Sequence, residues 1–471
     1  MTDRVRPYQY YDVAISICAT CFRRVDAKIV FQDGCVWMLK RCPEHGGERV
    51  LIADDVDYWR RAREVFLKPS EMPTRFQTPV KHGCPYDCGL CADHEQHSCL
   101  TLIEIGDGCN LECPVCYAAS GPKRMNWRSL AEVERMLDAL VESEGEPDVV
   151  QISGCEPTLH PEFFAILDAA RRRPIRHLMV NTNGLRIAQD EDFARQLAGY
   201  MPGFEVYLQF DSFERDTLLA LRGADTRNVH RQALERLERL GVSTTLVVTL
   251  ARGRNDGEIG KIVEHALTWR NVRGITFQPV QHAGRVEGLD GARDRLTLTE
   301  VRRRLLEQTS VFRPEDVLPV PCHPDAIAMA YALKLDGKTV PLTGMIDPKV
   351  LIEGGRNTIA YERDGTLQAK LFAAFSTAHS PQSGAASLKD LLCCLPKVEL
   401  PAGLGYENLF RVVILQFLDA HSFDVRSVKK SCVHIVHPHD LRIIPFDTYN
   451  LFYRDDLERT RLAPLVAGGA R

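Results

Sequence analysis

Three cysteines on one short segment carry the most specific chemical signal in this sequence. Cys109, Cys113 and Cys116 follow an apolar run and are spaced C-x3-C-x2-C. Cysteine thiolates are the usual ligands of 4Fe-4S clusters, and a saturated cluster takes four of them. Three thiolates therefore leave one iron with an open coordination position, as catalytic metal sites do. The spacing predicts an iron-sulfur cluster whose open iron binds a substrate or a cofactor.

This spacing, with the aromatic Tyr117 directly after the last cysteine, resembles the radical S-adenosylmethionine (radical SAM) superfamily. The resemblance implies that S-adenosylmethionine (SAM) chelates the open iron and that an electron from the cluster cleaves it to a 5'-deoxyadenosyl radical. It makes Cys109, Cys113 and Cys116 the expected catalytic residues. A zinc knuckle or a cluster that only transfers electrons is the alternative for these cysteines. The rest of the chain offers the other parts that such an enzyme needs.

From residue 100 onward, apolar runs typical of strands alternate with helical patterns, which indicates βα units around a parallel sheet. The strands are expected at residues 100–105, 149–153, 177–181, 205–210, 244–249 and 274–279. The helices between them are expected at residues 130–142, 161–172, 191–200, 227–240 and 256–269. Six such units resemble the partial (βα)6 barrel of radical SAM enzymes, an opened relative of the TIM barrel. In such barrels the active site gathers at the carboxyl ends of the strands.

Motifs at these strand ends complete the expected cofactor site. The stretch 153–157, Ser-Gly-Cys-Glu-Pro, resembles the superfamily's Gly-Gly-Glu-Pro motif, with Cys155 in place of the second glycine. A cysteine there is costly if the position needs a positive φ. The resemblance implies that the cofactor-binding residues are Tyr117, Gly154, Cys155, Glu156, Pro157, Asn183, Asp211 and Gln278. Residues 221–223, Leu-Arg-Gly, either lie over the pocket or cap a helix.

Ahead of the barrel, two pairs of metal-ligand residues flank a hairpin predicted from strands at 27–32 and 35–40. The four candidate ligands are Cys18, Cys21, Cys42 and His45. Two such pairs form a tetrahedral metal site on a ribbon. Zinc and a rubredoxin-like single iron both suit three thiolates and one imidazole. Cys35 lies on the apolar hairpin and is expected to be a buried small side chain.

Four more cysteines lie directly before the first barrel strand, at Cys84, Cys88, Cys91 and Cys99. They are expected to hold a second, fully coordinated 4Fe-4S cluster that passes electrons or stiffens the site. A four-thiolate zinc site is the alternative. His94 and His97 lie between these cysteines and are expected to be solvent-exposed loop residues.

The last third of the chain carries dispersed cysteines, at Cys322, Cys393, Cys394 and Cys432. Two interpretations are open: buried inert thiols, or a third cluster on Cys322, Cys432 and one or both of the adjacent pair. A helix is expected at residues 296–308. A second, packed helix is expected within 409–418, because its apolar residues have helical spacing.

The complete layout resembles one branch of the superfamily, which includes archaeal tetraether lipid synthases and enzymes described as dihydro-6-hydroxymethylpterin methyltransferases. It implies an α/β protein: a partial (βα)6 TIM-like radical SAM barrel, an N-terminal zinc-ribbon or rubredoxin-like metal domain and a C-terminal α+β domain. The expected divisions are residues 1–65, 66–99, 100–290 and 291–471. The resemblance also implies one mononuclear zinc or iron site and two or three 4Fe-4S clusters. Asp447 stands where some members carry another cysteine.

The leading functional hypothesis is hydrogen abstraction from an unactivated carbon, for carbon-carbon bond formation between lipid alkyl chains. The alternatives are C-methylation of a pterin or similar heterocycle, modification of a peptide, and a non-catalytic iron-sulfur electron carrier. A lipid substrate would need an apolar tunnel, for which residues 409–418, 441–444 and 449–453 offer material. Such stretches are more often part of the core.

Length and composition limit the number of domains, the partners and the compartment that can be expected. A chain of 471 residues is too long for one compact core. A net charge of -4 gives no electrostatic case for nucleic acid. Sixteen cysteines without a leader or a bilayer-spanning stretch predict a cytoplasmic protein whose cysteines bind metal. The expected partners are a small-molecule or lipid substrate and a reducing electron donor such as ferredoxin or flavodoxin, with transient membrane contact if the substrate is a lipid.

Overall fold

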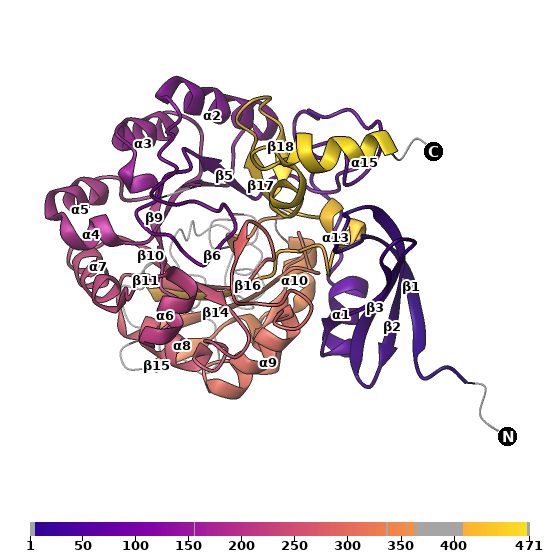
Figure 1. Ribbon diagram of the computed structural model, residues 1–471. Coiled ribbons are helices and arrows are strands. Elements are labelled where there is room, and N and C mark those ends of the chain that lie inside the picture. Colours follow the sequence, from indigo (N-terminus) through magenta and orange to yellow (C-terminus); the bar gives the residue numbers. More distant parts are fainter. Residues whose placement is uncertain are drawn as a thin grey trace, which may run out of the picture.

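A computed structural model of the chain describes residues 5–154, 156–335, 338–354, 356–361, 365 and 408–468. Three expected site residues, Cys155, Cys393 and Cys394, lie outside the described residues. Figure 1 shows a small N-terminal sheet beside a large curved sheet that helices surround. Within the described ranges, no helix has both the length and the apolar character that crossing a bilayer requires.

The N-terminal segment forms a four-stranded antiparallel sheet, here called the ribbon, in the order β1-β2-β3-β4. Its strands are β1 (Gln9–Ile17), β2 (Arg24–Gln32), β3 (Cys35–Cys42) and β4 (Gly46–Ala53), and α1 (Val56–Glu64) follows. Alternate residues such as Ile29 and Met38 are buried with Trp59 of α1, as the two-residue period of a strand requires. The predicted hairpin is confirmed as β2 and β3, whereas β1 and β4 lie outside the predicted strands.

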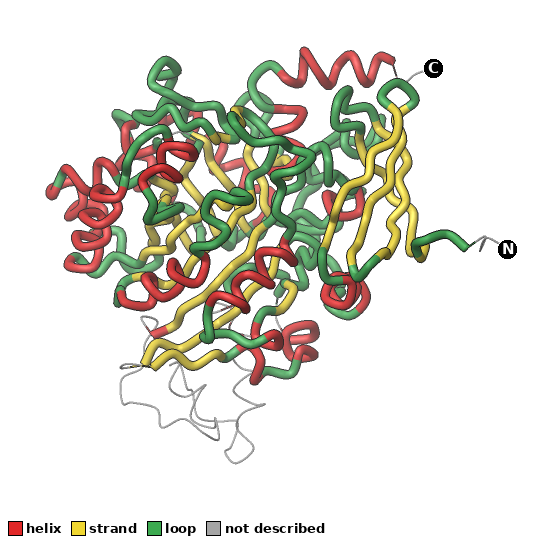
Figure 2. The backbone as a smooth tube through the Cα atoms, turned by 60° about the horizontal axis from the view of Figure 1, so that its bottom comes forward, coloured by secondary structure: helices red, strands yellow, loops and turns green. Residues whose placement is uncertain are grey.

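The barrel consists of six parallel strands, each paired with the next along the chain. The strands are β5 (Leu100–Glu104), β7 (Val149–Ser153), β8 (His177–Thr182), β9 (Phe204–Gln209), β10 (Thr244–Leu250) and β11 (Val272–Pro279). The helices are α2 (Leu130–Glu144), α3 (Phe163–Arg171), α4 (Leu185–Gln189), α5 (Glu191–Ala198), α6 (Arg215–Arg222), α7 (Arg227–Arg239) and α8 (Ile259–Thr268). All six predicted strands and all five predicted helices are confirmed, and Figure 2 shows helices outside the strands.

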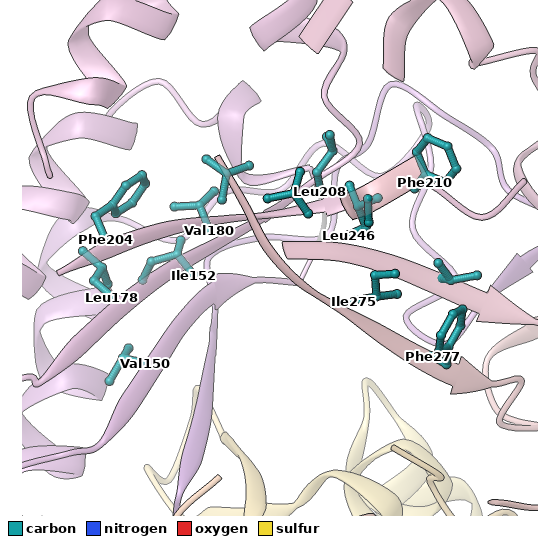
Figure 3. Packing of buried hydrophobic residues seen from close by; sticks show 14 of the residues in the cluster. Val150, Ile152, Leu178, Val180, Phe204, Leu208, Phe210, Leu246, Ile275 and Phe277 are labelled. Atoms are coloured by element: carbon teal, nitrogen blue, oxygen red, sulfur yellow. The ribbon is translucent and has the colours of Figure 1, made fainter. Parts of the chain in front are cut away.

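The barrel strands and the helices around them share one continuous hydrophobic core. Ile152, Val180 and Leu208 come from consecutive strands and belong to this core, which Figure 3 shows from close by. On the face that the helices cover the strand residues are apolar, whereas polar residues such as Gln151 and Glu205 alternate with them along the strands. This packing fixes the carboxyl ends of the strands, where the predicted site lies.

The residues after 290 extend the same sheet at both of its edges. At one edge β16 (Leu409–Leu415) pairs parallel to β11 and antiparallel to β14 (Ile327–Leu335). At the other edge β17 (Val433–Val436) pairs parallel to β5. The division expected at residue 290 therefore falls within one continuous sheet.

Shorter elements complete the described chain. The strands are β6 (Val115–Cys116), β12 (Arg285–Val286), β13 (Leu318–Pro319), β15 (Lys338–Pro341) and β18 (Ile443–Pro445). The helices are α9 (Leu298–Gln308), α10 (Pro348–Gly354), α13 (Val425–Lys429), α14 (Phe446–Thr448) and α15 (Ala463–Gly468). The single turns are η1 (Pro157–Leu159), η2 (Pro314–Asp316), η3 (Thr343–Met345), η6 (Tyr449–Tyr453) and η7 (Glu458–Leu462). The helix expected at 296–308 is confirmed as α9.

The helix predicted within residues 409–418 is wrong, because this stretch forms β16. The strand lies between β14 and β11 and buries Phe410, Val412 and Ile414. A strand that is covered on both faces reads as a continuous apolar run, which periodicity cannot distinguish from a buried helix.

Buried charged groups connect the ribbon and α1 to the rest of the molecule. The guanidinium of Arg63, on α1, donates to Asp325 at 2.9 Å and to Asp424 at 2.8 Å, and all three side chains are at most 6% exposed. Lys40 of β3 donates to the backbone carbonyls of Ala420 and His421. Charges this deeply buried are stable only when they are paired and hydrogen-bonded. These contacts therefore fix the ribbon against the C-terminal part of the chain.

Replacing Arg63 tests this connection. Arg63→Ala should lower the free energy of unfolding by about 3 kcal/mol, because Asp325 and Asp424 would be left buried without a cation. Denaturant titration measures the difference. Arg60→Ala is the matched control on the same helix, since the Arg60–Glu64 pair is exposed and its loss should change little. Equal stability of the two variants would contradict the role given to Arg63.

Candidate functional site

The three cysteines that follow β5 line one pocket at the carboxyl ends of the barrel strands. Cys113 is buried, and Cys109 and Cys116 are half-buried. All three line a pocket of about 120 Å³. The predicted residues that share its walls are Tyr117, Gly154, Glu156, Asn183 and Gln278. Among the described members of the predicted set, Pro157 and Asp211 lie outside these walls.

The motif after β7 needs a glycine at its second position. Gly154 has a φ of 105°, and a Cβ added there would lie 2.5 Å from the Cβ of Glu104. A side chain at this position would therefore clash with the end of β5 and strain the backbone. The close approach brings the backbone after β7 next to the strand that carries the triad loop.

Glu156 connects the motif to the neighbouring strand. Its buried carboxylate accepts hydrogen bonds from the Thr182 hydroxyl at 2.7 Å and from the Asn183 amide at 2.8 Å, and its own amide donates to Gly108 at 3.0 Å. Burial raises the pKa of Glu156, which these donors oppose. Glu156 thus joins the ends of β7 and β8 to the triad loop and acts as a positioning residue.

Asp211 acts through Arg222, which itself lines the pocket. Asp211 is fully buried, accepts from both Nε and Nη2 of Arg222, and accepts from the Thr249 amide at 2.7 Å. Burial raises the pKa of the Cys113 thiol, and the Arg222 guanidinium opposes this rise. Both expectations for residues 221–223 hold, since Gly223 ends α6 in the left-handed conformation while Arg222 faces the pocket.

A buried ion pair behind the triad loop was not apparent from the sequence. Arg454 donates to both oxygens of Glu104, at 2.7 and 2.9 Å, and lies over the rings of Tyr117 and Tyr449. Because Arg454 is fixed by Glu104, it also fixes Tyr117 in the pocket wall. The one available signal is Glu104 itself, the single charged residue of a strand that is otherwise uncharged.

The four candidate ligands of the ribbon come together at its tip. The ligand atoms of Cys18, Cys21, Cys42 and His45 all lie within 4.8 Å of one another. His45 Nδ1 is 3.6 Å from Cys18 Sγ and 3.4 Å from Cys42 Sγ. Three thiols and one imidazole at such distances fit a single tetrahedral ion. Cys35 is half-buried and is not part of this group.

Cys99 lies in a different group from the one expected for it. Its sulfur and those of Cys322 and Cys432 lie within 4.8 Å of one another, and all three residues are buried. The cause is the pairing of β5 with β17, which places Val433 opposite Leu100 and therefore Cys432 beside Cys99. Distance along the chain favours Cys91 as a neighbour of Cys99, but strand pairing decides the contact.

The expectation that His94 and His97 are exposed is wrong, since both are buried. His97 Nε2 lies 3.7 Å from the sulfur of Cys99, and its Nδ1 pairs with Glu144 at 3.0 Å. Burial opposes protonation of His97, but Glu144 raises its pKa to about 9. Burial lowers the pKa of His94, which contacts His434, to about 4. His97 thus lies directly against one of the buried sulfurs.

Cys84, Cys88 and Cys91 lie together along a small cavity, next to Lys429 of α13. Cys84 is half-buried, while Cys88 and Cys91 are buried. The hydroxyl of Tyr453 accepts from the amide of Cys88 at 2.9 Å, so η6 supports this loop. The loop thus remains a candidate metal site, but with Cys99 assigned to a different group.

Two parts of the chain match known families. Residues 103–266 match the radical SAM superfamily. Residues 10–54, which form the ribbon, match the HMPTM N-terminal zinc ribbon domain. The first match contains the triad and most of the barrel, and the second contains the four ribbon ligands.

Individual relatives extend the similarity over the chain. The 7,8-dihydro-6-hydroxymethylpterin dimethyltransferase of Methanocaldococcus jannaschii is 30% identical over 492 residues, covering 96% of each chain. The GTP 3',8-cyclase of Pectobacterium atrosepticum is 30% identical over 47% of this chain and 68% of its own. Among solved structures, Streptococcus suis SuiB bound to S-adenosylmethionine has a TM-score of 0.38 at 16% identity and matches just under half of each chain, 45% of this one and 47% of SuiB.

The M. jannaschii relative matches almost from end to end, so the similarity includes the ribbon, the triad and the C-terminal strands together. The triad lies where the barrel places its functional residues. This chain belongs to the radical SAM superfamily.

Proposed function

We propose that this radical SAM enzyme binds its SAM-cleaving 4Fe-4S cluster through Cys109, Cys113 and Cys116 and methylates a carbon of a pterin-like heterocycle. When bound, the cluster and SAM supply the electron and the reactive group that attack an unactivated carbon. The chain's own residues hold the reactants, orient them and exclude water.

The donor set at the pocket fits such a cluster. Three thiols converge on one pocket, and its other described walls carry no fourth cysteine. Arg222 provides a positive charge next to Cys113, which favours the thiolate form that binds iron. Gly154 allows the backbone to approach closely where a cofactor would be held. These features support an open cluster in this pocket.

A row of amide side chains carries the proposal for the substrate. Asn181, Gln209 and Gln278 project from the ends of β8, β9 and β11 into the pocket. Their hydrogen bonds within the protein are long, at 3.3 to 3.4 Å, so they can be exchanged for bonds to a ligand. Amides match the ring nitrogens and carbonyls of a heterocycle, whereas an alkyl chain would leave them unpaired at a cost.

The relative in M. jannaschii is a dimethyltransferase of a pterin, and this agrees with an amide-lined pocket. Lipid coupling, the leading hypothesis from the resemblance, would need an apolar tunnel, and the apolar stretches that could have lined one lie in the core or in strands of the sheet. Residues 409–415 and 443–445 are strands of the sheet, and residues 449–453 are buried. From the C-terminal part, Phe417 and Phe446 reach the pocket, where their rings stack at 3.9 Å.

Deleting the gene tests the choice of substrate. We expect methylated pterins to disappear from the cells while the lipid profile stays unchanged, as mass spectrometry of both fractions can show. Complementation with the wild-type gene should restore the pterins, and a Gln209→Leu/Gln278→Leu variant, which removes the amides, should not. Unchanged pterins together with lost lipid species would refute the heterocycle and assign the enzyme to alkyl chains.

The other cysteine groups are proposed as separate metal centres. The ribbon ligands would hold one zinc or iron ion, and the loop at Cys84, Cys88 and Cys91 would hold an auxiliary cluster. Cys99, Cys322 and Cys432 would hold a third centre, deep in the molecule. The three groups and the triad share no ligand in this assignment, so their metals can be removed independently.

The triad makes a quantitative prediction for iron content. Replacing Cys109, Cys113 and Cys116 with alanine together should remove roughly four irons per chain, as expected for one 4Fe-4S cluster. Iron analysis after anaerobic reconstitution measures this, and Cys35→Ala, outside every proposed site, should retain all the iron. If the triple variant kept its full iron content, the cysteines would not be the ligands.

The grouping of Cys99 can be decided by combining variants. If Cys99 and Cys432 share a centre, Cys99→Ala and Cys432→Ala should each remove the same metal, and the double variant should remove no more. Cys99→Ala combined with Cys84→Ala should remove two centres, which metal analysis and absorption spectra can resolve. The grouping expected from the sequence would be restored by the opposite result. In that case the Cys99/Cys432 double variant would lose two centres, and the Cys99/Cys84 double variant would lose only one.

A further inference from the structure

A groove at the β1 edge of the ribbon is not used by the proposed reaction. It has a volume of about 890 Å³ and runs between the ribbon and α13. We call it the basic groove and define it by Val13, Ile15, Lys28, Arg41, Arg426 and Lys429. In Figure 1 the ribbon and α13 lie next to each other at one side of the barrel.

The basic groove has the opposite charge to the chain as a whole. Lys40, Arg63 and Asp424 line it but are buried and paired, which leaves four accessible basic residues against two acidic ones, Asp26 and Glu95, whereas the chain carries a net charge of -4. Lys28 and Arg41 are exposed, and no ion pair is found for either among the described residues. Arg426 and Lys429 have only long pairs, at 3.6 Å, with Asp12 and Asp93. Such a concentration of charge attracts an acidic partner.

Exposed apolar side chains lie among these charges. Val13 is 69% exposed and Ile15 is 42% exposed, although both are on a strand whose other face is packed. They point outward on the face that also carries Lys28, which is paired with Val13 across the strands. A small apolar centre with a charged rim is the usual composition of a protein-protein interface.

One residue connects the basic groove to a cysteine loop. Lys429 lines the groove and also the small cavity formed by Cys84, Cys88 and Cys91. Its carbonyl accepts a hydrogen bond from the amide of Glu95, which also lines the groove. Cys84 is half-buried, so the loop lies close to the surface at this point.

We propose that the basic groove is the docking surface for the enzyme's electron donor, a small carrier protein with acidic side chains around its redox cofactor. This rests on the proposed function, which needs one electron for each SAM that is cleaved. The carrier is oxidised by one electron, and an iron-sulfur centre of this chain, reached through the loop at Cys84, is reduced by one electron. No bond or proton is transferred. The concave shape fits the convex edge of a small protein better than a flat lipid surface.

Charge reversal at the groove tests this proposal, with oxidised flavodoxin as the probe. Lys28→Glu/Arg426→Glu should raise the Kd for flavodoxin at low salt about tenfold, because steering by the basic groove is lost. For the wild type, the Kd should rise steeply with salt, since exposed charges are screened. Arg135→Glu/Arg231→Glu, on the exposed faces of α2 and α7, makes the same change in charge and should bind flavodoxin like the wild type. Fluorescence anisotropy of labelled flavodoxin measures the Kd of the wild type and of both variants.

Turnover separates docking from catalysis. With reduced flavodoxin, the groove variant should cleave SAM about tenfold more slowly than the wild type, and with dithionite at the same rate. Equal Kd values for the groove variant and the wild type would overturn the proposal. If the groove variant bound flavodoxin like the wild type but no longer bound phosphatidylglycerol vesicles, the groove would be assigned to a membrane and the proposal would also be overturned. If neither the wild type nor any variant cleaved SAM with dithionite, the proposed function would be refuted. The Kd values test the groove alone.

Discussion

The position of β5 in the sheet is the constraint on which the rest of the structure depends. It pairs with β7 on one side and with β17 on the other, and it has a cysteine site at each end. Cys99 directly precedes the strand and meets Cys432, while the triad loop follows the last residue, Glu104. A strand of five residues spans about 16 Å. One short, fully buried strand thus holds two candidate metal centres at a defined separation.

Buried ion pairs complete this positioning. Arg454 holds Glu104 and Tyr117 behind the triad, and Arg222 is held by Asp211 at its side. Each guanidinium is desolvated, so each needs its carboxylate in place, and the geometry is therefore well defined. The same principle operates at Arg63, which fixes the ribbon and with it one wall of the basic groove. Charge pairing inside the protein places the groups that the hydrophobic core alone would leave mobile.

The sequence was sufficient for the elements whose signals are local. The barrel strands and helices follow from alternating patterns, and the four ribbon ligands follow from their spacing on a hairpin. Contacts between distant parts of the chain could not be predicted in the same way. The sequence pattern groups Cys99 with Cys91, its neighbour along the chain, because such a pattern does not show the pairing of β5 with β17. The burial of His97 also depends on distant parts of the chain, since Glu144 and Asn357 contact it.

Polarity also has limits as a guide to function. Residues 409–415 are as apolar as a lipid tunnel would need to be, but they form a central strand. The common direction of the amides that line the pocket depends on β8, β9 and β11 lying in one sheet. Fold and cofactor chemistry thus follow from motifs, whereas the substrate follows from the walls of the pocket.

The proposed chemistry requires SAM to bind at an open iron held by Cys109, Cys113 and Cys116. Electron paramagnetic resonance of the reduced protein, recorded with and without SAM, tests it most directly. We expect SAM to change the cluster signal of the wild type. The variant with alanine at all three positions should retain signals from other clusters, and SAM should leave these unchanged. A wild-type signal that does not respond to SAM, or the same response in the variant, would contradict it.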